Sequence, residues 1–317
     1  MPTRIGRAAY LRPSPRCAGP ARAPCGCDYS ARVADLSVIV PARNAAESLP
    51  PLLYSLQSQT LGRDRFEVIV VDNGSSDGTA DVAERHGATV VRDRIPNRSR
   101  ARNLGAEAAA SELYAFTDAD CVPHPAWLAE LQARAHTAPL VAGEVKLRTS
   151  ERPNAIERFE ALWRFGQAAW VKQGWAATAN LLVHADAFAA IGGFDESWQH
   201  IGEDVDFCFR ARDAGFALGY CPNALVDHYG ESELRPFLRR FFRHGYSANQ
   251  AFHRFGVGHR AWRDPLPALA GDAALRRYGQ KPDGFEPAEW RRMSRLARAG
   301  YAARVAGSVW SELLRVR

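Results

Sequence analysis

FEVIVVDNGSSDGT, residues 66–79, places an uninterrupted apolar run directly before a polar turn rich in glycine, serine and aspartate. A short apolar run that ends in turn residues predicts a buried β-strand, and Gly74 and Gly78 permit tight turns. The segment that follows, 79–87, has helical character and ends at a glycine. This stretch therefore predicts a strand, a polar loop and a helix in succession.

The same succession recurs on both sides of this stretch. Apolar runs at 36–40, 88–91 and 113–117 predict strands, and the segments 46–57 and 99–111 predict helices. Strands that alternate with helices indicate an α/β fold with a mostly parallel sheet covered on both faces. The later chain continues the pattern, with strands expected at 139–147, 180–183 and 224–228 and helices at 155–170, 184–193 and 202–215.

Polar loops follow three of the predicted strands. They read PARN (41–44), DNGSSDGT (72–79) and TDADC (117–121). Ligands of open α/β sheets bind outside the carboxyl ends of the strands. We therefore expect these three loops to line one binding site.

Two aspartates, Asp118 and Asp120, stand one residue apart after the apolar run LYAFT. If the strand stays extended, both side chains share one face. Two carboxylates on one face suit a hard divalent cation, Mg²⁺ or Mn²⁺. The alternative is a polar turn in which aspartate side chains cap the following backbone amides.

Length and composition are those of an ordinary globular protein. The 317 residues are 46% hydrophobic and 24% charged, which allows one large domain or one domain with an appendage. No apolar run approaches the 18 or so residues of a membrane-spanning helix. The sequence holds neither the GxGxxG motif of a nicotinamide dehydrogenase nor a P-loop.

Charge is distributed unevenly along the chain. Residues 1–34 carry six arginines and one aspartate, and residues 235–317 carry 16 arginines and one lysine against six acids. Since the whole chain carries a net charge of +6, the middle part, 35–234, has a net charge of −10. An acidic body with basic ends predicts a cation site in the body and anionic partners for the C-terminal part.

The two ends differ in character. Residues 1–34 are rich in proline and arginine without an apolar period, so we expect them to be disordered and dispensable, with a native start possible near Val33. They hold no apolar core of a secretion signal. Residues beyond 233 read as helices rich in arginine and aromatic residues. These helices can lie on an anionic membrane surface or pack on the body; no nucleic-acid-binding motif is present.

Cysteine usage points to a reducing compartment. Cys121, Cys208 and Cys221 stand singly among apolar residues, as reduced core thiols do. Cys25 and Cys27 have no second pair at zinc-ligand spacing. We therefore expect a cytoplasmic protein, with possible peripheral contact at the inner face of the plasma membrane.

Taken together and in order, the motifs resemble those of family 2 of the nucleotide-sugar glycosyltransferases. The resemblance covers roughly residues 35–230 and implies a Rossmann-like A-type glycosyltransferase domain. It rests on VIVPARN (38–44), VDNGSSDGT (71–79), RSRARNLG (98–105), FTDADC (116–121), NLLV (180–183), GGFDE (192–196) and GEDVDFCFRARDAGF (202–216). The expected organisation is a disordered basic extension at 1–34, a catalytic domain at 35–232 with a nucleotide-binding half at about 35–121 and an acceptor half at about 122–232, and a helical extension at 233–317.

The resemblance assigns residues to the donor site. Asp72 would accept a hydrogen bond from the nucleotide base, and Arg98 and Arg102 would face the base or the diphosphate. The alternative for the two arginines is a solvated helix face. The acid that often follows the asparagine of PARN stands three residues later, at Glu47, so its role is open. The nucleoside pocket would be lined by Pro41, Ala42, Arg43 and Asn44.

The resemblance also assigns the metal site and the base. Asp118 and Asp120 form the family's DxD pair, with Asp120 the expected direct ligand of Mg²⁺ or Mn²⁺, and His228 would complete the metal or diphosphate site. Asp204 is the expected general base for the acceptor hydroxyl, and it is preferred over Glu203 for this role. The alternative for His228 is an ordinary polar histidine. The alternative for Glu203 and Asp204 is that they are acids at a helix start, where they interact favourably with the helix dipole. Trp175 and Asn180 are candidates for the sugar or acceptor surface.

The implied function is metal-dependent, inverting transfer of a sugar from a nucleoside-diphosphate sugar to a hydroxyl group. The acceptor would be a glycan, a lipid-linked molecule or a small molecule, and no specific nucleic acid is expected. Two alternatives are a catalytically inactive nucleotide-sugar-binding protein and a sugar nucleotidyltransferase.

Overall fold

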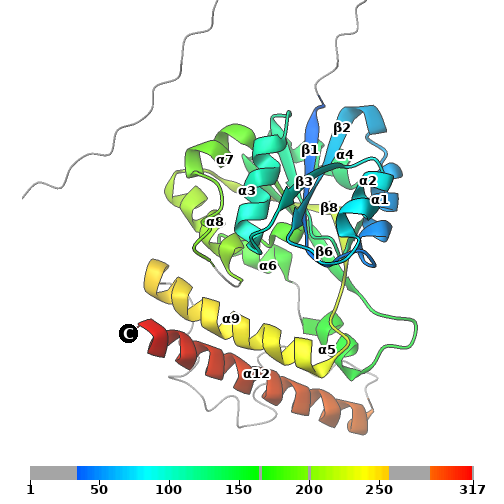
Figure 1. The fold of residues 1–317 in the computed structure, drawn as a ribbon. Helices are drawn as coiled ribbons and strands as arrows, with labels where there is room; N and C mark the ends of the chain where they lie inside the picture. The colour runs from blue at the N-terminus through cyan, green and yellow to red at the C-terminus, as the bar shows by residue number, and fades with distance from the viewer. Residues whose placement is uncertain (1–33, 164–165, 199–200, 257–285, 316–317) are drawn as a thin grey trace, which may run out of the picture. The chain divides into compact units, whose positions relative to one another are not determined.

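The computed structural model describes residues 34–163, 166–198, 201–256 and 286–315 (Figure 1). The chain divides into a unit at Met1–Arg32 and a unit at Val33–Arg317, and everything described belongs to the second. The expectations for residues 1–33, including disorder and an alternative start, lie outside the described residues.

Within these residues, eight strands form one sheet in the spatial order β3-β2-β1-β4-β7-β6-β8-β5. Strands β3, β2, β1 and β4 are parallel neighbours, as are β6 and β8, whereas β7 and β5 pair antiparallel with their neighbours. The predicted α/β fold with a mostly parallel sheet is confirmed. The strands are β1 Leu36–Ala42, β2 Phe66–Asn73, β3 Thr89–Asp93, β4 Leu113–Phe116, β5 Cys121–Pro123, β6 Leu140–Arg148, β7 Leu181–His184 and β8 Leu218–Tyr229.

Helices cover both faces of the sheet (Figure 1). Side chains alternate along β1, so that Val38 and Val40 join a core with α1, α2 and α4, while Ile39 joins a core with α3, α7 and α8 on the other face. These helices are α1 Leu49–Gln57, α2 Thr79–Arg85, α3 Arg98–Ala108, α4 Trp127–Ala135, α7 Ala185–Ile191 and α8 Glu203–Asp213.

Several predicted boundaries differ from the observed ones. Helix α1 begins at Leu49 and not near residue 46, because Pro50 and Pro51 suit the first turn of a helix. The predicted helix at 155–170 is two helices, α5 Ala155–Trp163 and α6 Gln167–Lys172. Strand β5 and helix α4 were not predicted; β5 has three residues and ends in proline, too short for a periodic signal.

The described residues of the C-terminal part form α9 Leu234–Phe255 and α12 Pro287–Arg315, which run in the same direction side by side (Figure 1). Glycines let the two backbones meet: a Cβ at Gly245 would collide with the Arg304 carbonyl, and one at Gly307 with the Phe242 carbonyl. A smaller apolar cluster that includes Phe159, Phe237 and Met293 joins this pair to α5. The described parts of the predicted extension are therefore helical and pack through aromatic side chains. The boundaries of the extension remain a prediction.

Close packing of α3 against the sheet gives a prediction about stability. A Cβ at Gly105 would overlap the Ile39 side chain of β1, which is buried. Gly105→Val is therefore expected to lower the free energy of unfolding by about 1–3 kcal/mol or more. Denaturant unfolding measures this. Gly78→Ala is the matched control, since a Cβ there has open space and should change stability little; equal losses in both variants would contradict the packing argument.

Candidate active site

A cavity of about 1330 Å³ lies at the carboxyl ends of the strands. Its lining brings together most of the residues that the sequence assigned to a site, from segments far apart in the chain. Asp72 is not on this lining, and its neighbour Asn73 is. The assigned residues on the lining are Pro41, Ala42, Arg43, Asn44, Arg98, Arg102, Asp118, Asp120, Trp175, Glu203, Asp204 and His228.

The two loops expected to hold the nucleoside are hydrogen-bonded to each other. Asn44 has a left-handed backbone, with φ of 49°, and its amide oxygen accepts a hydrogen bond of 2.8 Å from the Ser76 backbone NH. The Ala45 backbone NH donates to the Thr79 hydroxyl at 2.8 Å. The Asp72 carboxylate accepts a hydrogen bond of 3.0 Å from the Ser75 NH, within its own turn. Asn44 thus fixes the shape of the pocket wall, and the nucleoside contacts stay predictions.

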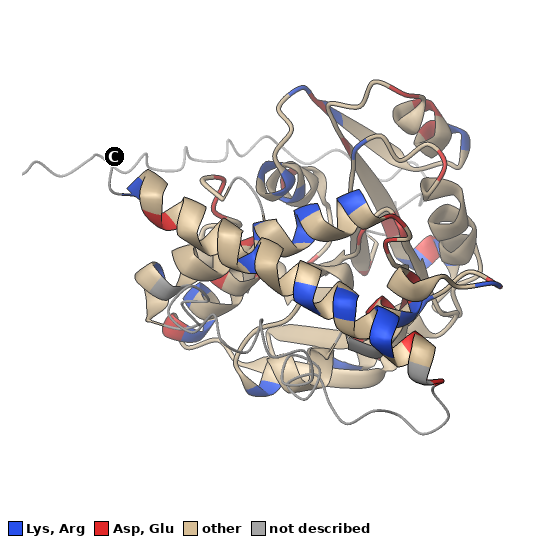
Figure 2. Ribbon diagram, turned by 90° about the horizontal axis from the view of Figure 1, so that it is seen from below, with Lys and Arg blue, Asp and Glu red and all other residues tan. Residues whose placement is uncertain are grey.

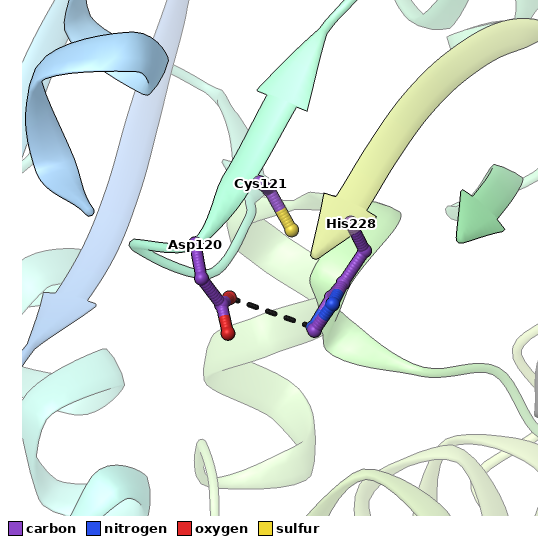
Figure 3. Close-up of side chains that lie close together, drawn as sticks. All are labelled: Asp120, Cys121 and His228. Atoms are coloured by element: carbon purple, nitrogen blue, oxygen red, sulfur yellow. Dashed lines mark ion pairs between the residues drawn. The ribbon is translucent and has the colours of Figure 1, made fainter. Parts of the chain in front are cut away.

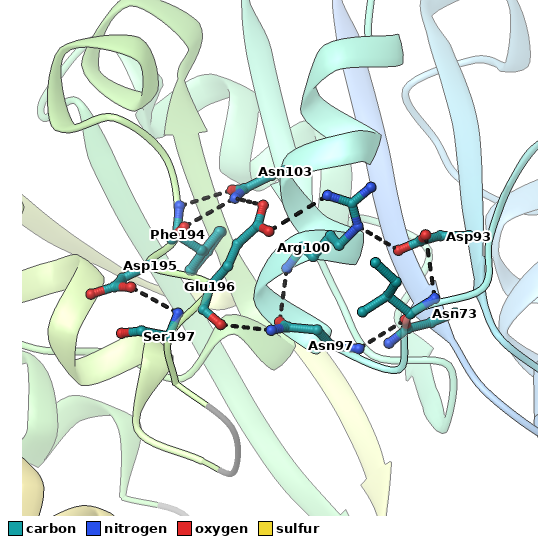
Figure 4. A network of polar contacts seen from close by, with 10 residues as sticks. Asn73, Asp93, Asn97, Arg100, Asn103, Phe194, Asp195, Glu196 and Ser197 are labelled. Atoms are coloured by element: carbon teal, nitrogen blue, oxygen red, sulfur yellow. Dashed lines mark hydrogen bonds and ion pairs between the residues drawn. The ribbon is translucent and has the colours of Figure 1, made fainter.

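A polar network anchors the start of α3 to the loop that contains GGFDE (Figure 4). The Asn97 NH donates to the Asn73 side chain at 3.0 Å, and the Asn97 amide donates to the Glu196 carbonyl at 2.7 Å. Asn103 exchanges two hydrogen bonds with the Phe194 backbone, of 2.8 and 3.0 Å. The sequence offered no role for GGFDE; its loop holds the helix that carries Arg98 and Arg102.

Asp118 and Asp120 do not share a face of an extended strand. The chain turns after β4, and the Cys121 NH donates to the Asp118 carbonyl at 3.1 Å. The Asp118 carboxylate lies 3.0 Å from Arg102, and the Asp120 carboxylate lies 3.4 Å from Nε2 of His228. The shared-face expectation was wrong because a tight turn directs the two carboxylates to different partners. The alternative expected a turn but also side-chain caps on backbone amides, and no hydrogen bond described for Asp118 or Asp120 is of that kind.

The pairing of β5 with β8 brings Asp120 and His228 together, since Cys121 lies opposite His228 in the register. Figure 3 shows the Asp120 carboxylate directed at the imidazole. His228 Nδ1 lies 2.7 Å from the Tyr229 carbonyl, an acceptor, so that Nδ1 carries the proton and donates it. An imidazole that is neutral in this tautomer presents the Nε2 lone pair toward a carboxylate oxygen, an arrangement that a cation between the two would stabilise.

Cys121 is the third potential ligand within reach. Its sulfur, the Asp120 oxygens and His228 all lie within 4.8 Å of one another. The thiol is buried, and this burial, together with the nearby Asp120 and Asp118 charges, raises the pKa of Cys121 well above its ordinary value. Sulfur is also a soft ligand, whereas Mg²⁺ and Mn²⁺ prefer hard oxygen donors. The donor set is therefore one carboxylate and one imidazole, with the remaining positions open to the cavity.

Arg102 is the centre of a buried ion-pair network. It is 1% exposed, and its two η nitrogens lie 2.8 Å from Glu203 and 3.0 Å from Asp118. Arg98 reaches Glu203 at 3.6 Å and remains half-exposed on the cavity wall. The solvated-face alternative is therefore wrong for Arg102. Because both of its η nitrogens form ion pairs with carboxylates, Arg102 holds Asp118 and Glu203 in position.

Glu203 and Asp204 are adjacent in sequence, but their surroundings are opposite. Burial raises the pKa of Glu203, yet Arg98 and Arg102 outweigh it, so the pKa lies below its ordinary value. Asp204 forms no ion pair with a described residue, and burial and the Glu203 charge raise its pKa to about 7. A carboxylate poised near neutral pH at a cavity wall suits a general base, whereas Glu203 is a fixed anion.

Trp175 and Asn180, the two candidates for the sugar or acceptor surface, have different surroundings in the structure. Trp175 lines the cavity and stacks on Trp170, with ring centroids 4.5 Å apart. Asn180 is fully buried and bonds to the Trp127 indole and to the carbonyls of Glu144 and Ala224. Asn180 was therefore wrongly assigned; it is a structural residue.

Comparison with known proteins agrees with this geometry. Residues 37–178 match the model of "Glycosyl transferase family 2", and residues 118–310 match that of "Glycosyl transferase family group 2". The chain is 33% identical over 224 residues to the "Glycosyltransferase AglE" of Haloferax volcanii, covering 66% of this chain and 71% of that protein. The chain belongs to glycosyltransferase family 2. It is an enzyme of the glycosyltransferase class.

Two further comparisons show how much of each relative this chain resembles. The family 2 chain is 33% identical over 228 residues to the pre-mycofactocin glycosyltransferase of Mycobacterium tuberculosis, covering 68% of this chain and 47% of that protein, about half its length. The mannosyltransferase PcManGT of Pyrobaculum calidifontis, solved with GDP-Man and Mn²⁺, has a TM-score of 0.61 at 21% identity, covering 88% of both chains. At that identity, the structural likeness shows the fold.

Proposed function

We propose that this protein transfers a sugar from a nucleoside-diphosphate sugar to an acceptor hydroxyl, with a divalent cation and with inversion at the anomeric carbon. The observation that carries the proposal is that the Asp120–His228 pair and Asp204 line one cavity. The first is a cation site of oxygen and nitrogen, and the second is a carboxylate with a pKa of about 7. Transfer requires both kinds of group, one for the leaving diphosphate and one for the attacking hydroxyl.

Asp120 and His228 would hold the cation, with Asp118 nearby on Arg102. A divalent ion bound there supplies charge stabilisation to a departing diphosphate. The mixed carboxylate and imidazole donors suit Mn²⁺ at least as well as Mg²⁺, and the related mannosyltransferase was solved with Mn²⁺. Asp118 would act chiefly by keeping Arg102 in place, and only secondarily as a ligand.

Asp204 would take the proton from the acceptor hydroxyl as this oxygen attacks the anomeric carbon. One base on the acceptor side is what a single displacement needs, and a single displacement inverts the anomeric centre. Glu203 would remain ionised between Arg98 and Arg102 and would hold the pKa of Asp204 up by its charge. The stacked Trp170 and Trp175 would form an apolar wall for the acceptor or the transferred sugar.

A donor screen tests this function. The protein is heated with a panel of nucleoside diphosphates and their sugars, with Mn²⁺ or with EDTA. We expect one nucleoside diphosphate to raise the melting temperature by several degrees only with Mn²⁺, and its sugar to be turned over. Release of pyrophosphate from a nucleoside triphosphate and a sugar phosphate would identify a nucleotidyltransferase. Binding without any transfer or donor hydrolysis would identify an inactive binding protein.

A membrane contact is also proposed, through the outer face of α12. Among the described residues, no helix is long and apolar enough to cross a bilayer. Along α12, Arg291, Arg292, Arg295 and Arg298 are exposed, and the exposed apolar residues Val309, Trp310, Leu313 and Leu314 follow them. Figure 2 shows the basic positions along the long C-terminal helices.

The acids of α12 do not oppose such a contact. Glu289 pairs with Arg158, and Glu312 pairs with His253 of α9 at 2.7 Å. Basic side chains beside an exposed tryptophan and leucines suit a surface of anionic lipids. A peripheral position at the inner face of the plasma membrane would bring the cavity to a lipid-linked acceptor. Cys121, Cys208 and Cys221 are buried free thiols, which fits that reducing side.

Vesicle co-sedimentation measures this contact. We expect the full-length protein to sediment with vesicles containing anionic lipid at low salt, and less so at high salt, because screening shortens the reach of surface charge to about 8–10 Å near physiological ionic strength. Changing Trp310 and Leu313 to alanine should release the protein, whereas Leu234→Ala, an exposed leucine on α9, should not. A protein that stays in the supernatant at low salt would contradict the contact.

A further inference from the structure

Helix α9 contributes a basic wall to the cavity. Arg239 and Arg243, one helical turn apart, both line it. The walls formed by the loop after β4 and by the start of α8 carry acids instead, among them Asp120 and Asp204. The cavity therefore has an acidic side, which attracts a cation, and a basic side on α9.

The two arginines lack the partners that their neighbours on α9 have. Arg240, which lies between them in sequence, pairs with Glu160 and reaches Glu231 at 3.7 Å. Neither Arg239 nor Arg243 forms an ion pair with any residue in the described part of the chain. Like charges four residues apart on a helix destabilise it, so this pair is unfavourable until an anion binds.

The surroundings of Arg243 are themselves mostly cationic. Burial, Arg239 and Arg98 lower its pKa, while Glu231 acts in the opposite direction. Arg98, whose charge acts on Arg243, also lies 3.6 Å from Glu203, the neighbour of Asp204. Arg239, Arg243 and Asp204 therefore line the same cavity.

We infer that Arg239 and Arg243 form a phosphate-binding subsite, and that the acceptor of this enzyme carries a phosphate group. The inference rests on the proposed function, which places the acceptor hydroxyl at Asp204. Guanidinium groups match the oxygens of a phosphate with two parallel hydrogen bonds, and a pair of them can share one doubly charged group. The donor's diphosphate has the same chemistry, but its place is at the cation site of Asp120 and His228.

Phosphate binding by the full-length protein tests the subsite. Wild type and the variant Arg239→Gln/Arg243→Gln are titrated with inorganic phosphate in EDTA, which removes the cation site from the measurement. Arg85→Gln/Arg134→Gln, two exposed arginines on α2 and α4 that do not line the cavity, is the control. A second titration uses the nucleoside diphosphate from the donor screen, with Mn²⁺.

We expect the α9 variant to bind phosphate at least tenfold more weakly than wild type and the control, and its nucleoside diphosphate affinity to change less than threefold. Three outcomes would overturn the inference: no saturable phosphate binding by wild type, equal affinities in the α9 and control variants, or an equal loss of nucleoside diphosphate affinity. The last would assign the arginines to the donor. Failure of the proposed function would appear elsewhere, as transfer that survives in Asp204→Asn.

Discussion

Asp204→Asn is expected to lower the rate of sugar transfer by about 10²–10⁴-fold, the usual contribution of a positioned base. The asparagine has nearly the same shape and can still accept the hydrogen bond from the Val205 NH, which is 2.8 Å long in wild type. Donor affinity should therefore stay within about threefold of wild type. Transfer kinetics and nucleotide titration measure both; a matching loss of donor affinity would place Asp204 in the donor site.

The pH dependence follows from the same carboxylate. Burial and Glu203 raise the pKa of Asp204 to about 7, and only the ionised form accepts a proton, so transfer should rise with pH through about 7 and then level off. A raised folded-state pKa also means that stability falls as pH increases from about 4 to 7. Asp204→Asn should thus melt at a higher temperature than wild type at pH 8, with little difference at pH 4. Asp213→Asn, an exposed acid on the same helix, serves as the control.

Asp120→Asn is expected to remove metal-dependent activity. The amide loses the negative charge that faces His228, and a bound ion contributes several kcal/mol to charge stabilisation, so transfer should fall by about 10²–10⁴-fold. Because Asp120 is about half-exposed, with 46% of its side chain accessible, the fold should be unaffected. Kinetics across a Mn²⁺ titration and thermal unfolding test both parts.

Asp118→Asn provides the contrast. Asp118 is a partner of the buried Arg102, so this variant should lose about 1–3 kcal/mol of stability as well as activity. If Asp118→Asn left stability unchanged while Asp120→Asn reduced it, the roles given to the two aspartates would be reversed.

The sequence was sufficient for the other strands of the sheet, though not for β5, and for the polar loops, because their signals are local. An apolar run such as FEVIVV followed by DNGSSDGT indicates a strand and a turn without knowledge of the rest of the chain. The order of the motifs then indicated which loops meet. The conformation of the chain at Asp118 was not predictable in this way. The sequence is compatible with both an extended strand end and a turn, and the turn is marked by the backbone hydrogen bond from Cys121 to Asp118.

The contacts that shape the site join residues far apart in the chain and could not be predicted from the sequence. Arg102 meets Glu203 across 101 positions. Nothing in the spacing of RSRARN shows that its third arginine, Arg102, is buried while the first, Arg98, is half-exposed on the cavity wall. The position of His228 opposite Cys121 depends on β5, which is too short to leave a pattern. Asn180 was misassigned because a polar residue beside a strand can face either a ligand or the backbone of its neighbours, and only packing decides.

Calorimetric titration of the wild-type protein with its nucleoside diphosphate, in Mn²⁺ and in EDTA, tests the central claim most directly. Asp120 and His228 present two ligands that face each other across 3.4 Å and leave the other positions to the cavity. The ion would therefore join protein and diphosphate. We predict that binding is at least tenfold tighter in Mn²⁺ than in EDTA, and that Asp120→Asn abolishes the difference. Equal affinity of the wild type in Mn²⁺ and EDTA would contradict the account.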